Sequence, residues 1–263
     1  MDNNGNLNLI PNRQSVADAP LARPTTKIQS FKRWLLHKAR SIAFSIAPLR
    51  RAMERKRMTP TENMAHWDSL MSQVQFSTYL GGTINVDGAN AMTALMLKFH
   101  AIAQPSILDV GCSGGTLICA LNSFARYSGV DVSSVAISAA KQMASDGFSD
   151  RLDQIDFQAA DLQQFNPSST FDVIIFNEVL YYLNTNQAVT EVARYAKSLN
   201  KGGLIVISLK DDGKSHAILK LLTRKFKWVD GILWQRKATS YDFAVRPNRE
   251  RPAFLVGALR LAD

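Results

Sequence analysis

Three aspartates lie at or just after the ends of segments that are expected to form strands, at positions where their carboxylates would share one ligand. Asp109 lies two residues before Gly111, in a glycine-rich turn, and Asp131 and Asp161 end or follow the next two strands. The carboxyl ends of parallel strands lie at one edge of a sheet, which is where open α/β sheets bind ligands. Glycines there let a ligand approach the backbone, although the turn alone would also suit a tight connection without a ligand. Together with the aspartates, the turn predicts a ligand site at this edge.

The segments that must position these aspartates alternate between strand-like and helix-like patterns after residue 105. We expect strands over 106–110, 127–131, 155–160, 171–176 and 204–208. Helices are expected from the glycine-rich turn to residue 124, from an N-cap at Ser133 or Ser134 to about residue 143, and over 187–199. This alternation is typical of a parallel sheet with helices on both faces.

The C-terminal part of the chain departs from this alternation. Residues 241–245 and 254–261 resemble strands, and the short polar link between them contains two prolines. A link of this length cannot hold the crossover helix that a parallel connection needs. We therefore predict that these two strands form an antiparallel hairpin.

Upstream of residue 105 the pattern is irregular at first and then helical. Residues 1–27 mix Asn, Pro, Ser and Thr without periodicity, which indicates a disordered tail. From residue 31 apolar side chains recur at helical spacing, and Pro48 should break this segment into two helices. Further helices are expected over 61–71 and 88–103. The expected parts are therefore a tail (1–27), a helical extension or lid (28–104) and an α/β domain (105–263).

Together these features resemble the class I S-adenosylmethionine-dependent methyltransferases over roughly residues 105–262. Residues 109–115, Asp-Val-Gly-Cys-Ser-Gly-Gly, look like the first motif of that family, often written DxGxGxG, with Ser113 in place of its middle glycine. Residues 171–183 resemble the family's fourth-strand motif, and 199–204 resemble the turn into its fifth strand. The resemblance implies a Rossmann-like α/β fold with a seven-stranded, mostly parallel sheet and a C-terminal antiparallel hairpin, here preceded by the helical extension.

The resemblance also implies S-adenosylmethionine as the cofactor and gives roles to single residues. Asp131 matches the residue that accepts from both ribose hydroxyls, a task suited to a carboxylate. Asp161 and Leu162 match the pair beside the adenine, where a carboxylate accepts from the exocyclic amine, and Gly111 is expected beside the methionine end. The expected cofactor-binding residues are Asp109, Gly111, Cys112, Ser113, Gly115, Asp131, Val132, Asp161, Leu162 and Asn177.

A nicotinamide dinucleotide enzyme is the main competing interpretation of the fold, because it would also use an acidic residue near Asp131. Its fingerprint requires a third glycine five positions after Gly111, where this chain has Thr116. It also gives no reason for Asp109 or for the C-terminal hairpin. We therefore favour the methyltransferase interpretation.

The sequence specifies the methyl acceptor less well. Asn177 is followed by Glu178-Val179-Leu180 and lacks the Pro-Pro-aromatic sequence with which base-modifying enzymes clamp a flipped base, so a nucleic-acid substrate is not expected. Residues 178–183 instead resemble small-molecule and sugar methyltransferases, including the nodulation-factor group. We therefore expect a small-molecule or saccharide acceptor, including a lipid-linked one, methylated on oxygen rather than nitrogen. A non-catalytic cofactor-binding or regulatory subunit and an RNA methyltransferase are the alternatives.

A hydroxyl acceptor needs a base, whereas an amine must only be neutral. The candidate catalytic residues are Glu178, Tyr181 and His216, and Tyr182 and His66 are further candidates for contact with the acceptor. The tyrosines and histidines also have structural explanations. One of the two tyrosines would pack in the core while the other lines the cofactor, His216 would be a solvated residue of a polar loop, and His66 would lie on a surface helix.

The composition excludes several other classes of protein. The chain has 263 residues, of which 46% are hydrophobic and 20% charged, so it buries a core and is not disordered as a whole. Cys112 and Cys119 are too few for a disulfide framework, and no metal site is expected. The sequence has no run of about 18 apolar residues and no secretion signal, which predicts a cytoplasmic protein.

The net charge of +9 is unevenly distributed along the chain. Residues 1–60 carry +9, residues 61–196 carry −8, and residues 197–263 carry +8. The ends are therefore expected to meet an anionic partner, while the acidic middle serves another purpose. The basic segment 31–57 has three explanations: a helix packed on the domain, a peripheral contact with an anionic membrane, or a nucleic-acid contact or nuclear address.

Overall fold

The computed structural model describes residues 58–73, 84–236, 241–242 and 253–262, together with scattered positions between 39 and 54. The tail expected over residues 1–27 lies outside the described residues, and so does most of the basic segment 31–57. None of the described helices has the length and hydropathy needed to cross a bilayer.

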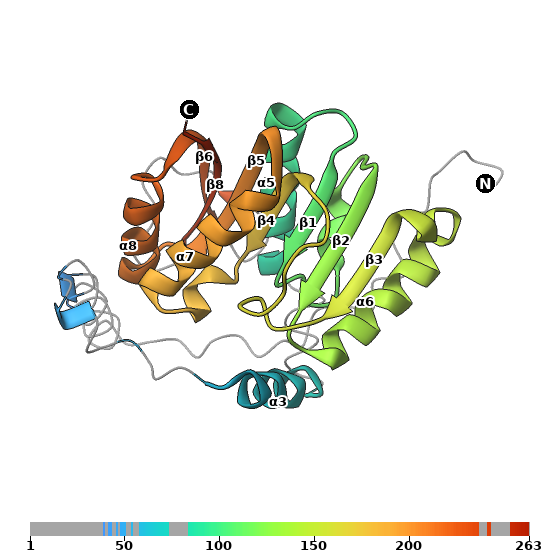
Figure 1. Ribbon diagram of the computed structural model, residues 1–263, viewed down its shortest axis with the longest axis horizontal. Helices are drawn as coiled ribbons and strands as arrows, with labels where there is room; N and C mark the ends of the chain where they lie inside the picture. The colour runs from blue at the N-terminus through green and yellow to red at the C-terminus, as the bar shows by residue number, and fades with distance from the viewer. Residues whose placement is uncertain are drawn as a thin grey trace.

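A single sheet runs through the described part of the chain, in the order β3-β2-β1-β4-β5-β8-β6-β7 (Figure 1). Its first five strands, all parallel, are β1 (Ser106–Val110), β2 (Arg126–Asp131), β3 (Ile155–Ala159), β4 (Phe171–Asn177) and β5 (Leu199–Lys210). The antiparallel strands are β6 (Phe226–Arg236), the two-residue edge strand β7 (Tyr241–Asp242) and β8 (Ala253–Leu261). Apart from β7, this is the expected seven-stranded, Rossmann-like sheet with a C-terminal antiparallel pair.

The partners in that antiparallel pair differ from the prediction. The strand expected over 254–261 pairs with β6 and β5, whereas residues 241–242 pair only with β6, so 241–245 and 254–261 do not form the hairpin. Strand β6 was not predicted. Its register shifts between Trp228 and Asp230, which interrupts the alternation of apolar and polar residues that identifies a strand.

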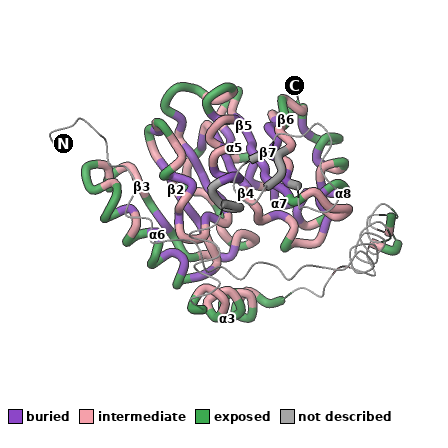
Figure 2. Tube along the Cα trace, turned by 180° about the vertical axis from the view of Figure 1, so that it is seen from behind, coloured by how far each residue is buried: buried purple, intermediate pink, exposed green. Residues whose placement is uncertain are grey.

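Helices cover both faces of the sheet. α5 (Ile84–His100) and α6 (Ser134–Gly147) pack on one face, where Met96 and Ala140 join a buried cluster with Ile107. α7 (Thr185–Tyr195) and α8 (Gly213–Leu222) pack on the other face, where Val192 and Ile218 join a second cluster. Figure 2 shows that the buried residues concentrate in the strands between these two layers.

Two of the local predictions after the first turn need correction. The helix expected to residue 124 is only a 3-10 turn, η2 (Thr116–Ala120), followed by Leu121 in an extended conformation. Helix α8 was not predicted, and it places His216 on a helix rather than on a loop. The predicted N-cap of α6 is confirmed, since the Ser133 hydroxyl accepts a hydrogen bond from the Ala136 N–H at 3.1 Å. Short 3-10 turns also occur at η3 (Ser149–Gln154), η4 (Leu180–Tyr182) and η5 (Ala196–Ser198).

Helix α3 (Pro60–Met71) lies at the carboxyl edge of the sheet, below the ends of β2 and β3 in Figure 1. It begins with a capping box, in which Thr59 accepts from the Glu62 N–H and the Glu62 carboxylate accepts from the Thr59 N–H. None of its residues is fully buried. Polar contacts therefore contribute much of its attachment to the domain.

Candidate cofactor and acceptor site

The turn after β1 has the left-handed backbone that its glycines permit. Gly111, Ser113 and Gly115 have φ angles of 80°, 50° and 75°. At Ser113, where the family motif has glycine, this conformation costs about 1–2 kcal/mol. The N–H groups of Gly111 and Cys112 donate to the Val130 carbonyl at 2.7 and 3.1 Å, which ties the turn to the end of β2.

The environment of Gly111 adds a second reason for a glycine at this position. A Cβ added at this residue would lie 2.6 Å from Cγ2 and 2.8 Å from Cβ of Val179, a residue of the loop after β4. The glycine is thus required by the contact between two loops at the carboxyl edge, in addition to its positive φ. Cys112 is buried beside it, and burial raises the pKa of its thiol well above the ordinary value.

Asp131 is held by two backbone N–H groups. Its Oδ2 accepts from Ser113 and its Oδ1 from Ser133, both at 2.9 Å, so the turn and the start of α6 fix the carboxylate together. Val132, partly exposed, lies between these two contacts. Burial raises the pKa of Asp131, and the two N–H groups oppose this rise. Each carboxylate oxygen has a second acceptor position, so the group can also accept from two hydroxyls.

Asp109 and Asn177 each keep a buried oxygen with no hydrogen-bond partner among the described residues. Asp109 accepts from the Tyr127 hydroxyl through Oδ2 at 2.5 Å, while its Oδ1 is unpaired. The Asn177 amide donates to Asn90 at 2.8 Å, while its Oδ1 is unpaired. Buried acceptors without donors are costly, so their presence at a ligand edge favours a ligand with N–H groups. The amino group of S-adenosylmethionine fits this requirement.

Asp109 should make the stability of the protein depend on pH. Burial raises the pKa of its carboxyl to about 7, with Asp131 adding to the rise and Tyr127 opposing it. A carboxyl that binds its proton more tightly in the folded chain destabilises that chain as the pH rises from about 4 to about 7. At 1.36 kcal/mol per pKa unit the loss is at most about 4 kcal/mol.

Denaturant titrations of the wild type and of Asp109→Asn at several pH values between about 4 and 8 measure this effect. The variant keeps an acceptor for Tyr127 but cannot ionise, so its free energy of unfolding should fall less than that of the wild type over this range. Identical pH dependence in the two proteins would contradict the assignment.

Asp161 is buried at the start of the loop that leaves β3. Its Oδ1 accepts from the Gln163 N–H at 2.8 Å and its Oδ2 from the Asn63 amide of α3 at 3.0 Å. A cavity of about 650 Å³ opens beside it, between α3, β2, β3 and the loop over 160–171. Its lining also includes Arg126 and Phe171, which begin β2 and β4, so it extends from Asp161 toward the amino ends of these strands.

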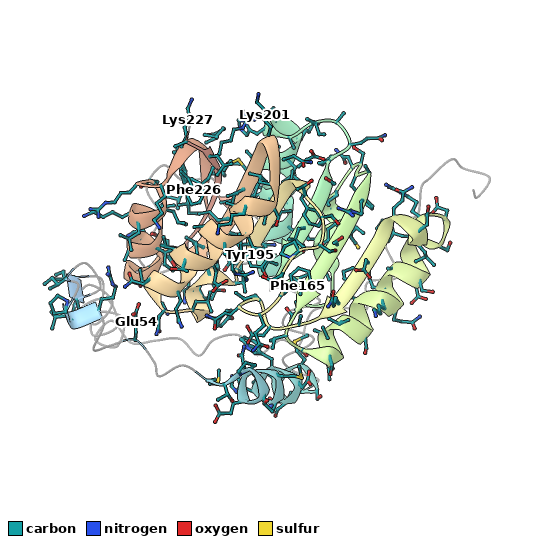
Figure 3. The ribbon with its side chains drawn as sticks, in the orientation of Figure 1. Glu54, Phe165, Tyr195, Lys201, Phe226 and Lys227 are labelled. Carbon is teal, nitrogen blue, oxygen red and sulfur yellow. The ribbon has the colours of Figure 1, made fainter. Side chains whose placement is uncertain are left out.

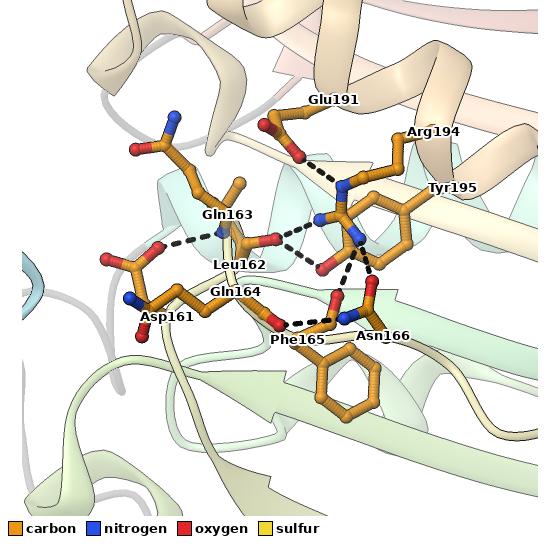
Figure 4. A network of polar contacts seen from close by, with 9 residues as sticks. All are labelled: Asp161, Leu162, Gln163, Gln164, Phe165, Asn166, Glu191, Arg194 and Tyr195. Carbon is orange, nitrogen blue, oxygen red and sulfur yellow. Dashed lines mark hydrogen bonds and ion pairs between the residues drawn. The ribbon is translucent and has the colours of Figure 1, made fainter.

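The loop after Asp161 is anchored by two residues of α7 that the sequence did not single out. The Arg194 guanidinium donates to the carbonyls of Leu162 and Phe165, and the Tyr195 hydroxyl donates to the Leu162 carbonyl at 2.8 Å (Figure 4). Glu191 accepts from Arg194 at 2.8 Å and completes the network. Phe165 and Tyr195 lie close together in Figure 3, with their rings stacked at 6.5 Å. Arg194 therefore fixes the position of Leu162.

Glu178 and Tyr181 form a closed hydrogen-bonded group with β5. The Glu178 carboxylate accepts from the Ser208 hydroxyl through Oε1 and from the Tyr181 hydroxyl through Oε2 at 3.0 Å. Burial raises the pKa of both Glu178 and Tyr181. Glu178 also has a φ of 55°, a strained conformation for a residue with a side chain. Both carboxylate oxygens are engaged, so the group can hold the loop after β4 in place.

The other candidates lie around the same edge in different environments. His216 is exposed at the start of α8, and its Nε2 lies 2.6 Å from Asp211, a hydrogen bond that raises the pKa of the imidazole. Tyr181 packs against the core, whereas Tyr182 is 56% exposed and contacts the ring of Trp67 at 4.8 Å. His66 is exposed on α3. Among the described residues no cluster of metal ligands is present.

Comparison with known proteins gives the family and the fold of this chain. A family described as a methyltransferase domain matches residues 103–241. The solved structure of the N-methyltransferase NodS from Bradyrhizobium japonicum WM9, with S-adenosylhomocysteine, has 21% identity and a TM-score of 0.61, and the match covers 76% of this chain and 99% of that one. A search of curated proteins gave no match.

Two further solved structures show the same fold. Magnesium protoporphyrin IX methyltransferase from Synechocystis PCC 6803 has 18% identity and a TM-score of 0.57, over 79% of this chain and 100% of that one. The 1,6-didemethyltoxoflavin-N1-methyltransferase of Burkholderia thailandensis has 18% identity and a TM-score of 0.58, over 80% and 94%. The family match covers more than half of the sequence, so this chain belongs to the methyltransferase domain family and is a class I S-adenosylmethionine-dependent methyltransferase.

Proposed function

We propose that this methyltransferase acts on a small-molecule or saccharide acceptor and methylates oxygen in preference to nitrogen. The observation that carries the proposal is the exposed Tyr182 beside Trp67, next to a loop after β4 that has no proline. Two aromatic rings at the carboxyl edge suit a ring-shaped acceptor, since aromatic side chains bind apolar faces. The missing prolines argue against a flipped nucleobase.

The residues of the chain would bind and orient the two reactants. The bound cofactor supplies an electrophilic methyl group on its sulfonium sulfur. Asp131 would hold the ribose, Asp161 and Leu162 the adenine, and Asp109 and Asn177 the amino group, while Gly111, Cys112, Ser113, Gly115 and Val132 line the turn. Methyl transfer then depends on alignment of the acceptor and on exclusion of water, both of which a covered sheet edge favours.

For a hydroxyl acceptor, His216 is the strongest candidate base. An ionised Asp211 can only accept, so the imidazole must donate to it through Nε2, which leaves Nδ1 free to take a proton. Glu178 is less suited, because the hydrogen bonds that its carboxylate accepts from Ser208 and Tyr181 stabilise the ionised form and lower its basicity. Tyr181 donates its only proton to Glu178 and is therefore assigned a positioning role.

A methyl-transfer screen with labelled cofactor tests the proposal. It should be run against sugars, glycolipids, phenols, amines and RNA, and label is expected on a hydroxyl of a small molecule or saccharide. With that acceptor, His216→Ala should lower kcat at least about 100-fold and leave S-adenosylhomocysteine affinity unchanged. Label on RNA, or label on amines alone, would overturn the acceptor assignment. No transfer to any class, with normal cofactor binding, would favour the non-catalytic alternative.

We further propose that residues 28–104 form a helical extension that covers the carboxyl edge, that residues 105–263 form the catalytic domain, and that residues 1–27 form a tail. Two contacts support the covering role. Asn63 of α3 donates to Asp161, and Glu54 accepts from the Thr185 N–H at the start of α7 at 2.6 Å. Figure 3 places Glu54 near the carboxyl edge, apart from the labelled Lys201 and Lys227.

The basic segment 31–57 is proposed to bring the protein to anionic membranes from the cytoplasm, where a lipid-linked acceptor would be available. Its described apolar residues Ile42, Ile46 and Leu49 are all exposed. Cations beside exposed apolar side chains favour an anionic lipid surface.

Co-sedimentation with anionic vesicles measures this contact. The full chain should bind at low salt and dissociate as salt is added, because the screening length falls to about 8 Å at physiological ionic strength. Deletion of residues 1–58 should abolish vesicle binding and leave cofactor affinity nearly intact. Full-length protein that stays in the supernatant at low salt would refute the membrane contact, and loss of stability on deletion would instead indicate simple packing.

A further inference from the structure

Helix α3 is attached to the N-terminus of α6 by the carboxylate of Asp68. Its Oδ1 accepts from the Ser133 hydroxyl at 2.7 Å and from the Val135 N–H at 3.2 Å, and its Oδ2 accepts from the Ser134 hydroxyl at 3.0 Å. These hydrogen bonds lower the pKa of Asp68, against the effect of burial. An anion at a helix N-terminus is also favoured by the helix dipole. The contact therefore holds α3 in one position.

This contact is linked to the carboxylate proposed to hold the ribose. Ser133 donates its hydroxyl to Asp68 and its N–H to Asp131, at 2.7 and 2.9 Å. One residue thus joins α3 to Asp131.

The second contact of α3 reaches the carboxylate on the adenine side. The Asn63 amide donates to Oδ2 of Asp161 at 3.0 Å. The exocyclic amine of adenine would offer an N–H donor of the same kind to this buried carboxylate. Trp67, one turn further along α3, contacts Tyr182 in the loop after β4. The helix therefore bridges segments that follow β2, β3 and β4.

We propose that α3 is a gate over the cofactor site and that Asn63 and Asp68 are the positioning residues that hold it closed. The inference rests on the proposed cofactor roles of Asp131 and Asp161. Because α3 has no fully buried residue, opening breaks a few polar contacts and exposes little core. Cofactor and product must pass this helix, so its opening sets the rate of exchange in both directions.

Stopped-flow measurement of S-adenosylhomocysteine binding and release tests the gate. In Asp68→Ala and Asn63→Ala both the association and the dissociation rate should rise at least about fivefold, while the equilibrium Kd stays within about threefold. Ser69→Ala is the matched control, because Ser69 is exposed on α3 and its side chain makes no hydrogen bond to the part of the domain that the structure describes. Its rates should equal those of the wild type.

Three outcomes would overturn the proposal. A rise in the dissociation rate alone, with weaker affinity, would make Asn63 and Asp68 direct contacts of the ligand. Unchanged rates in both folded variants would show that α3 does not limit exchange. Unchanged amide hydrogen exchange of α3 in Asp68→Ala, measured without ligand, would show that the contact does not hold the helix. Asp68→Asn, which keeps the shape of the side chain, replaces the alanine variant if the latter fails to fold.

If Asp131 and Asp161 do not bind the cofactor, the outcome differs from failure of the gate. A wild-type chain that does not bind S-adenosylhomocysteine contradicts the proposed site. In that case faster amide exchange of α3 in Asp68→Ala than in Ser69→Ala would still show that Asp68 holds the helix closed.

Discussion

Asp131→Ala should weaken the binding of S-adenosylhomocysteine at least about tenfold. The variant loses two hydrogen bonds from ribose hydroxyls to a charged acceptor, each worth about 1.5–3 kcal/mol. It also leaves the N–H groups of Ser113 and Ser133 without their acceptor, which loosens the turn and the start of α6. Isothermal titration calorimetry measures the change in Kd directly.

The matched control for this variant is Asp146→Ala. Asp146 is exposed on α6, the helix that follows Asp131, and its carboxylate accepts a hydrogen bond from Gln142 one turn earlier. This variant should bind as the wild type does. An acidic residue after the second strand would also suit NAD. NAD should nevertheless bind neither the wild type nor Asp131→Ala. Unchanged affinity in a folded Asp131→Ala chain would refute the assignment of the ribose site.

The central strands are predictable because each is a short apolar run between turn residues. The expected strand over 106–110 coincides with β1, and Phe171 begins β4 as expected. Because parallel strands end at one edge, the placement of Asp109, Asp131 and Asp161 follows from these runs alone. The N-cap at Ser133 follows from its position before an amphipathic segment.

The elements that escaped prediction break the local rules in identifiable ways. In β6 the register shift after Trp228 removes the period of two, and Gly231 and Gly257, paired across the strands, leave space for the Trp228 ring. Helix α8 begins with polar residues, yet Asp212 accepts from the Ser215 N–H at 2.8 Å. That capping pattern, an aspartate before apolar residues at helical spacing, is the signal from which α8 could have been found.

Contacts between distant segments carry no local signal. Asn63 and Asp161 are 98 positions apart, and Arg194 reaches the Leu162 carbonyl across 32. A side chain that binds a backbone carbonyl leaves no pattern in the sequence of the partner. The residues that hold the site in place, Asn63, Asp68, Asn90 and Arg194, therefore emerge only from the three-dimensional arrangement.

Gly111→Val should abolish binding of S-adenosylhomocysteine while leaving most of the secondary structure intact. The residue has a φ of 80°, and its added Cβ would lie 2.8 Å from Cβ of Val179, an atom next to the backbone that cannot rotate away. The left-handed conformation costs about 1–2 kcal/mol and overpacking about 1–3 kcal/mol, so the turn and the loop after β4 should separate. Calorimetry for binding and circular dichroism for structure measure both effects.

Gly114→Ala is the control within the same turn, because a Cβ added at Gly114 meets no atom of the described residues within 4 Å. It should bind nearly as the wild type does. Adding Val179→Ala to Gly111→Ala removes the γ-carbons of Val179 but leaves both β-carbons and the positive φ. The double variant should therefore recover only part of the affinity that Gly111→Ala loses. Partial recovery of this kind would show that the glycine serves the contact between the two loops as well as the backbone turn. Normal binding by Gly111→Val would mean that neither requirement controls the cofactor site.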